Sequence, residues 1–204
     1  MNREIFVPEN YVKIEGKANP LLVNLSPFLL LLFGIILFGV PFYFIWPEKL
    51  PDIIANLEIP YLDRLVNSIP FILIVIVGII VHEMIHGIFD IIFLKNGLKS
   101  IKIKFKGGAL FCLPTGVLKI SEFKIILLMP LIIMGIIPAL ISLFVGNSLL
   151  LFFGIIFIAL AGADIYILYL LLTKLKVQNN YWFENHPSNP FIGIVYEPKE
   201  EGKE

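Results

Sequence analysis

The chain has 204 residues and a formal net charge of zero, from 16 basic and 16 acidic residues. Hydrophobic residues make up 58% of it and charged residues 16%, whereas soluble globular chains have roughly 45–50% and 25%. This composition excludes a water-soluble domain, and the balanced charge excludes the basic field that holds a nucleic acid backbone. The single cysteine, Cys112, excludes both an intrachain disulfide and a cysteine-rich metal cluster. A metal site in this chain must therefore use histidine and carboxylate ligands.

Four apolar segments predict transmembrane helices, since each can cross a hydrocarbon core of about 30 Å. Residues 125 to 163 form a run of 39 uncharged residues, too long for one span. This run is divided at the turn-like sequence Gly146-Asn147-Ser148. Prolines in the third span, Pro130 and Pro138, are expected to kink it. The predicted spans are residues 28–46, 69–94, 123–145 and 149–173.

A β-hairpin is predicted over residues 100–113, between the second and third spans. Lysines alternate with apolar residues from Ile101 to Lys106, and Gly107-Gly108 follows as a turn. One interpretation is an amphipathic ribbon that rests on the membrane with its lysines among the lipid headgroups. The sharper interpretation is a strand edge that pairs with an extended peptide.

The distribution of basic residues predicts the orientation of the chain in the membrane. Fourteen of the 16 lie in the three segments that four spans place on one side, and only Lys49 and Arg64 lie on the other. The positive-inside rule makes the first side cytoplasmic. We therefore expect an all-α, multi-pass protein of the cell membrane with both termini and the hairpin in the cytoplasm. It forms a single membrane domain, residues 1–204, with a tail over 174–204 that is disordered from Glu197 onward.

The second span contains His82-Glu83-Met84-Ile85-His86-Gly87, which matches the pattern His-Glu-x-x-His. On a helix, a spacing of four places both imidazoles on one face, where they can bind one Zn²⁺, and places Glu83 to act on a metal-bound water. Ionisable groups inside a span cost about 2.5–3.5 kcal/mol each on insertion scales. Three such groups within five residues therefore require compensation by a metal or by a function, and we favour this over side chains that only form hydrogen bonds with other helices.

A catalytic zinc site has three protein ligands and one open position, and the sequence offers three candidates for the third ligand: Asp164, His186 and Asp90. Asp164 is the only charged residue of the fourth span. The helical rise places Asp164 about 23 Å from the outer end of the fourth span. His82 and His86 lie about 20 Å and 26 Å from the outer end of the second span, so all three residues are expected at a similar depth. We favour Asp164 over His186, which would have to fold back from the tail. Asp90 lies one further turn along the helix, too far to bind the same ion, and suits a supporting or water-admitting role.

Several short motifs follow one another along the chain: His82-Glu83-Met84-Ile85-His86-Gly87, Cys112-Leu113-Pro114, Met129-Pro130, Gly162-Ala163-Asp164 and His186-Pro187. Their order resembles the site-2 protease group of intramembrane zinc metalloproteases. More narrowly, it resembles a family of small prokaryotic membrane proteins classed as zincin peptidases. The resemblance covers Ile69 to about Gly193, although the site-2 proteases commonly carry Asp-Gly where this chain has Asp164-Ile165.

The resemblance implies hydrolysis of peptide bonds within or beside the membrane. The expected enzyme is a zinc metallopeptidase in which Glu83 activates zinc-bound water, with a membrane protein or peptide as substrate and the lipid bilayer as surroundings. A metal-handling or transport protein and a non-catalytic scaffold with a retained metal site are the alternatives. Glu83 distinguishes them, because transport and scaffolding need the ligands but no adjacent general base.

Overall fold

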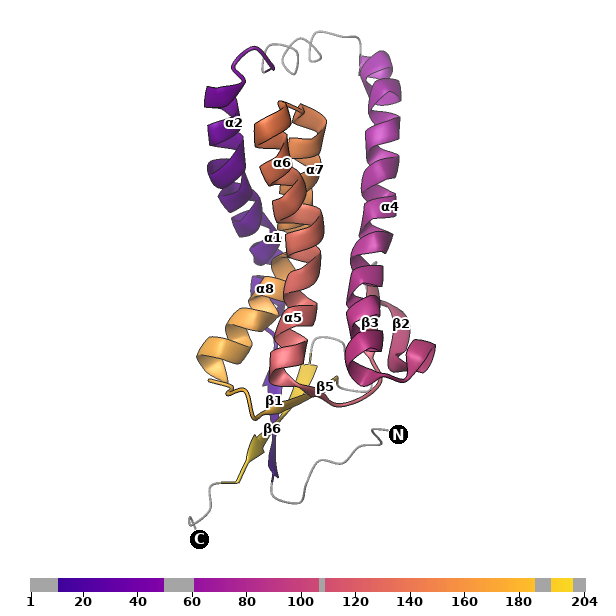
Figure 1. Ribbon diagram of the computed structural model, residues 1–204, viewed down its shortest axis with the longest axis vertical. Helices are drawn as coiled ribbons and strands as arrows, with labels where there is room; N and C mark the ends of the chain where they lie inside the picture. The colour runs from indigo at the N-terminus through magenta and orange to yellow at the C-terminus, as the bar shows by residue number, and fades with distance from the viewer. Residues whose placement is uncertain (1–10, 50–60, 107–108, 186–191, 200–204) are drawn as a thin grey trace. The chain divides into compact units, whose positions relative to one another are not determined.

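The computed structural model describes residues 11–49, 61–106, 109–185 and 192–199. Among these residues, three helical segments are long and apolar enough to cross a membrane, and a fourth qualifies if a bent pair of helices is counted as one span. This arrangement fits a multi-pass membrane protein. The first segment, Pro20–Ile45, consists of α1 (Pro20–Gly34), η1 (Ile35–Gly39) and α2 (Val40–Ile45). The second, Ser68–Leu94, is the apolar part of α4 (Tyr61–Leu94), which is the long helix labelled in Figure 1.

The third segment, Ile120–Val145, departs from α-helical geometry between its two prolines. Pro130 ends α5 and Pro138 lies in the first turn of α6, and the residues between them form a π-helix. Proline cannot donate a main-chain hydrogen bond, so such local widening accommodates it within a helix. The three elements are α5 (Ile120–Pro130), η3 (Leu131–Ile136) and α6 (Ile137–Val145).

The fourth segment is bent. Its two parts, Ser148–Leu160 and Gly162–Lys174, meet at an angle of 41°. The sequence predicted one helix over 149–173 and gave no sign of this break at Ala161. The predicted turn before it is present, since Gly146 adopts a left-handed φ of 65° and Asn147 caps the following helix by accepting from the N–H of Leu150. The elements are α7 (Ser148–Leu160), α8 (Gly162–Tyr169) and η4 (Leu170–Lys174).

The chain divides into two compact units. One unit consists of Leu25–His82 and Pro130–Gly162, and its core joins η1 and α2 to α6 and α7. Helices α6 and α7 approach closely because a Cβ at Gly154 would lie only 2.6 Å from the main-chain nitrogen of Ala139. The buried core residues are Phe38, Phe42, Ala139, Leu151, Ile155 and Ile158.

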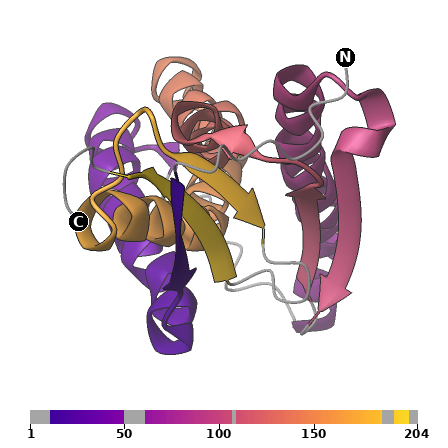
Figure 2. The same ribbon diagram turned by 90° about the horizontal axis from the view of Figure 1, so that it is seen from below.

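The other unit consists of Met1–Asn24, Glu83–Met129 and Ala163–Glu204, and it contains a four-stranded antiparallel sheet. Figure 2 shows β6 between β1 and β5, in the strand order β1-β6-β5-β4. The ring of Phe183 on β5 stacks on Phe123 of α5, which fixes the sheet against that helix. The strands are β1 (Tyr11–Lys17), β4 (Leu118–Lys119), β5 (Trp182–Asn185) and β6 (Ile192–Pro198).

This sheet is missing from the all-α prediction. Tyr11 pairs with Pro198 and Lys17 with Ile192, so segments from the two ends of the chain meet. Pairing between such distant strands leaves no local signal in the sequence. As a result, Glu197 and Pro198, which the sequence assigned to a disordered tail, belong to β6.

The predicted hairpin is present in the same unit as strands β2 (Ile101–Lys106) and β3 (Ala109–Pro114). Its Gly107-Gly108 turn lies outside the described residues. Ile103 and Phe105 on one face of β2 are 66% and 75% exposed. The hairpin therefore presents apolar side chains on one face and Lys102 and Lys104 on the other, as the alternation predicts.

Candidate metal centre

Helix α4 carries two stripes of side chains at a spacing of four residues, one buried and polar, the other exposed and apolar. The buried stripe contains His82, His86 and Asp90, whose exposed fractions are 6%, 7% and 0%. Residues four apart lie one turn apart on one helix face. A helix that buries its ionisable residues and exposes its apolar ones suits a lipid environment. The exposed stripe is Ile76, Ile80, Met84, Ile88 and Ile92.

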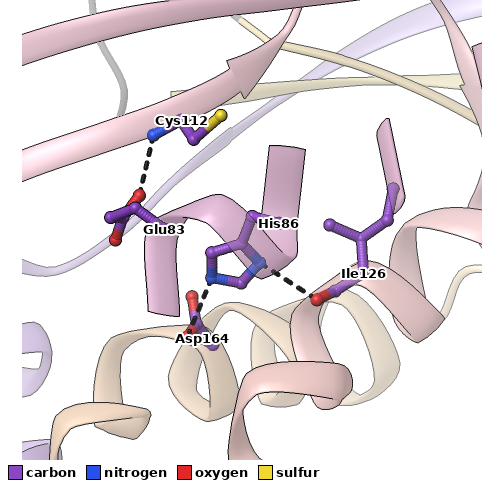
Figure 3. A network of polar contacts seen from close by, with 5 residues as sticks. All are labelled: Glu83, His86, Cys112, Ile126 and Asp164. Carbon is purple, nitrogen blue, oxygen red and sulfur yellow. Dashed lines mark hydrogen bonds and ion pairs between the residues drawn. The ribbon is translucent and has the colours of Figure 1, made fainter. Parts of the chain in front are cut away.

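The ring of His86 is oriented by main chain from another helix. Its Nδ1 lies 3.0 Å from the carbonyl oxygen of Ile126 in α5 and donates to it, as Figure 3 shows. This bond leaves Nε2 as the ring nitrogen that can bind a metal, and Nε2 lies 3.5 Å from Oδ2 of Asp164. Histidine ligands of metals are commonly fixed by such a donor bond to a carbonyl.

Asp164 reaches this point because the fourth segment breaks just before it. Helix α8 begins at Gly162, so Asp164 lies in its first turn, where the helix dipole favours a negative charge. Glycine is required at the break, since a Cβ at Gly162 would lie 2.5 Å from the main-chain nitrogen of Pro27. The break and its glycine thus place a carboxylate beside the ring of His86.

His82, His86 and Asp164 form a cluster that could hold a metal ion. One ligand atom from each lies within 4.8 Å of the others. His82 precedes Glu83 on the unbroken helix α4, so its position one turn from His86 follows from that helix. In a tetrahedral zinc site with bonds of about 2.0–2.1 Å, neighbouring ligand atoms are about 3.4 Å apart. The separation of 3.5 Å between His86 and Asp164 fits this geometry, and two nitrogens with one oxygen form a zinc-type ligand set.

Glu83 is bound to the hairpin. Its Oε2 accepts a hydrogen bond of 2.7 Å from the main-chain N–H of Cys112 in β3, seen in Figure 3. The strand can come this close because position 87 has no side chain: a Cβ at Gly87 would lie 2.8 Å from Sγ of Cys112. Strand β3 therefore holds the carboxylate of Glu83 close to the cluster of His82, His86 and Asp164.

The thiol of Cys112 is kept in its protonated form by this environment. Burial raises its pKa, and the negative charges of Asp90 and Glu83 act in the same direction, which brings the pKa to about 12. Cys112 is therefore a neutral neighbour of the site in the metal-free chain, and it is not part of the cluster of His82, His86 and Asp164.

Sequence reasoning found the side chains of this site but not the main-chain groups that orient them. The Ile126 carbonyl and the Cys112 N–H have no signature in the sequence. The one available signal was Gly87, because glycine inside a helix often marks a close approach by another segment. Asp90 lies in the buried stripe but outside the cluster of three. His186, the alternative ligand, lies outside the described residues.

A family model described as "Putative zincin peptidase" matches residues 75–177, which include the His-Glu-x-x-His motif, the hairpin and Asp164. No curated protein and no solved structure matches the chain.

Proposed function

Because the chain belongs to the putative zincin peptidase family, we propose that it is a membrane-embedded zinc metalloprotease that hydrolyses peptide bonds within or beside the membrane. The observation that carries the proposal is the cluster of His82, His86 and Asp164, within 4.8 Å, with Glu83 in the same helix. These groups lie among helices apolar enough to cross a membrane.

His82, His86 and Asp164 are the proposed ligands, which leaves one position open for water or substrate. A bound Zn²⁺ polarises the carbonyl of the peptide bond and makes a water molecule acidic near neutral pH. The protein contributes the orientation of the ligands. The Ile126 carbonyl fixes the His86 ring, and the start of α8 fixes Asp164.

Glu83 is the proposed general base. It accepts a proton from the attacking water as the water oxygen bonds to the carbonyl carbon. When the bond between this carbon and nitrogen breaks, Glu83 passes the proton to the leaving amine. The hydrogen bond from Cys112 limits the orientations of the carboxylate. A general base is effective only when its carboxylate is held in a fixed position relative to the proton that it accepts.

The outer edge of β3 is the proposed binding site for an extended substrate. In an antiparallel ladder, main-chain groups point alternately toward and away from the partner strand. The Cys112 N–H points away from β2, because it reaches Glu83. Pro114, which has no N–H, falls in the same outward-facing set, since it lies two residues from Cys112. A transmembrane helix hides its carbonyls in its own hydrogen bonds, so pairing along this edge would stabilise an unwound segment beside Glu83.

The site is proposed to lie in the cytoplasmic half of the bilayer. His86 precedes the end of α4 at Leu94 by eight residues, or about 12 Å of helix. The segment from the end of α4 to the first turns of α5 contains the hairpin and seven lysines. The positive-inside rule assigns such a lysine-rich segment to the cytoplasm.

Replacement of Glu83 by Gln tests the proposal. Membranes from cells that produce the wild-type chain, Glu83→Gln or the control Glu122→Gln would be compared by mass spectrometry for cleaved membrane proteins, and the purified proteins for zinc content. Glu122 accepts a bond from the Lys119 N–H at the start of α5 and serves as a carboxylate outside the site.

We expect Glu83→Gln to retain zinc and to lose about 10²–10⁴-fold in cleavage rate, as the loss of a general base does. The Glu122→Gln control should cleave as the wild type does. Cleavage by Glu83→Gln at the wild-type rate would overturn the mechanism. Zinc binding with no fragment dependent on Glu83 would favour the metal-handling alternative, for which the ligands suffice.

A further inference from the structure

The carboxylate of Asp90 is buried and, among the described residues, has no hydrogen-bond partner. Its side chain is 0% exposed, and neither of its oxygens has a hydrogen-bond partner in the part of the chain that the structure describes. Buried charges in proteins are normally paired or bound to metal, because removing a carboxylate from water is very unfavourable without compensation. An isolated carboxylate at this position therefore requires an explanation.

Asp90 lies next to the proposed zinc ligands. It follows His86 by one helical turn in the buried stripe of α4. Unlike Asp90, Glu83 has a donor among the described residues, the Cys112 N–H. Asp90 is also outside the cluster of ligand atoms that lie within 4.8 Å of one another.

We propose that the counter-charge of Asp90 is the metal ion held by His82, His86 and Asp164, so that Asp90 is a positioning residue that strengthens zinc binding without ligating zinc. This inference rests on the proposed metal site. Two neutral imidazoles and one carboxylate leave a dication with one excess positive charge. A further carboxylate on the same buried helix face offsets it, and in an apolar environment that attraction is weakly screened.

The test uses the full chain in detergent, stripped with a chelator, and compares the wild type with Asp90→Asn and Asp90→Leu. Zn²⁺ affinity is measured by competition with a fluorescent chelator. Thermal unfolding is followed with and without Zn²⁺. Co²⁺ is used as a spectroscopic probe of the ligand set, and Glu122→Gln is the control.

We expect both Asp90 variants to bind Zn²⁺ about 10–100-fold more weakly, the size of effect seen when groups that support metal ligands are removed. Without metal they should unfold at the same or a higher temperature than the wild type, since a buried carboxyl group with no hydrogen-bond partner among the described residues has been replaced. If Asp90 served only to stabilise the fold, its replacement would instead lower the unfolding temperature of the metal-free chain. The Co²⁺ spectrum should keep its wild-type form in the Asp90 variants and change in Asp164→Ala.

Wild-type Zn²⁺ affinity in both Asp90 variants would overturn this inference. A lower unfolding temperature without metal, combined with unchanged affinity, would also overturn it and assign Asp90 to packing. An altered Co²⁺ spectrum would show that Asp90 is a ligand. A wild-type chain that binds no zinc would overturn this inference together with the metal site. A chain that needs Asp90 for tight binding but cleaves nothing would overturn only the protease proposal.

Discussion

The main-chain N–H of Cys112 donates to Oε2 of Glu83 at 2.7 Å. This bond joins the β2–β3 hairpin to the second residue of the His-Glu-x-x-His motif. The strand proposed to bind substrate thus contacts the proposed base directly, through its own main chain. A single main-chain donor therefore links the binding edge to the chemistry. It can be removed without replacing Glu83.

Cys112→Pro removes that donor. Because the Cys112 N–H points away from β2, proline there leaves the ladder between β2 and β3 intact, and a strand edge tolerates it. We expect cleavage to fall about tenfold or more, as the misplacement of a catalytic group does, with zinc content unchanged. The matched variant Cys112→Ala keeps the N–H and should cleave as the wild type does. Equal cleavage by both variants would show that this bond does not position Glu83.

The sequence predicts the apolar helices and the pair of histidines on one helix face, because both depend on local patterns. Runs of apolar residues predict the membrane helices, and the spacing of His82 and His86 predicts their shared face. The sequence does not predict the pairing of β1 with β6, nor the break at Ala161, because these depend on contacts between distant segments. The rise along a helix nevertheless predicts that Asp164 lies near the histidines, because most of the fourth segment before Asp164 precedes the bend of 41°.

Asp164 is expected to be essential for tight zinc binding. The purified wild type should contain about one Zn²⁺ per chain, and His82→Ala or His86→Ala should abolish binding, because each removes one of three ligands. Asp164→Ala should weaken affinity markedly, while His186→Ala should leave it nearly unchanged. Elemental analysis and chelator competition measure these effects. Loss of zinc from His186→Ala together with retention by Asp164→Ala would reverse the assignment of the third ligand.

The thiol of Cys112 is expected to react slowly with alkylating reagents. The thiolate is the reactive form, and burial together with the charges of Asp90 and Glu83 raises the thiol pKa to about 12. Alkylation of the metal-free chain should therefore be slow at pH 8 and accelerate as pH rises.

Asp90→Asn removes one negative charge, lowers the pKa of the thiol and should speed the reaction at fixed pH. Cys112 is the only cysteine, so mass spectrometry reports it directly, and unfolded chain gives the reference rate. A folded chain that reacts at the unfolded rate would contradict the raised pKa.

The four-stranded sheet leads to a prediction about membrane topology that does not use the basic residues. Strand β1 precedes the first apolar segment, β4 lies between the second and third, and β5 and β6 follow the fourth. Strands of one sheet must lie on one side of a membrane, because an open sheet edge does not occur in hydrocarbon. An even number of crossings therefore separates β1 from β4, and β4 from β5.

We accordingly predict that the bent pair α7–α8 crosses the membrane as one span, which gives four spans, and the lysines predict that the side of the sheet is the cytoplasm. Reporters fused after Lys199 and before β1 should both report from the cytoplasm, and a reporter inserted after Lys49 should report from outside. A C-terminal reporter on the outer face would mean that α7 and α8 enter and leave on the same side. That result would contradict the pairing of β1 with β6, because their strands would then be separated by the bilayer.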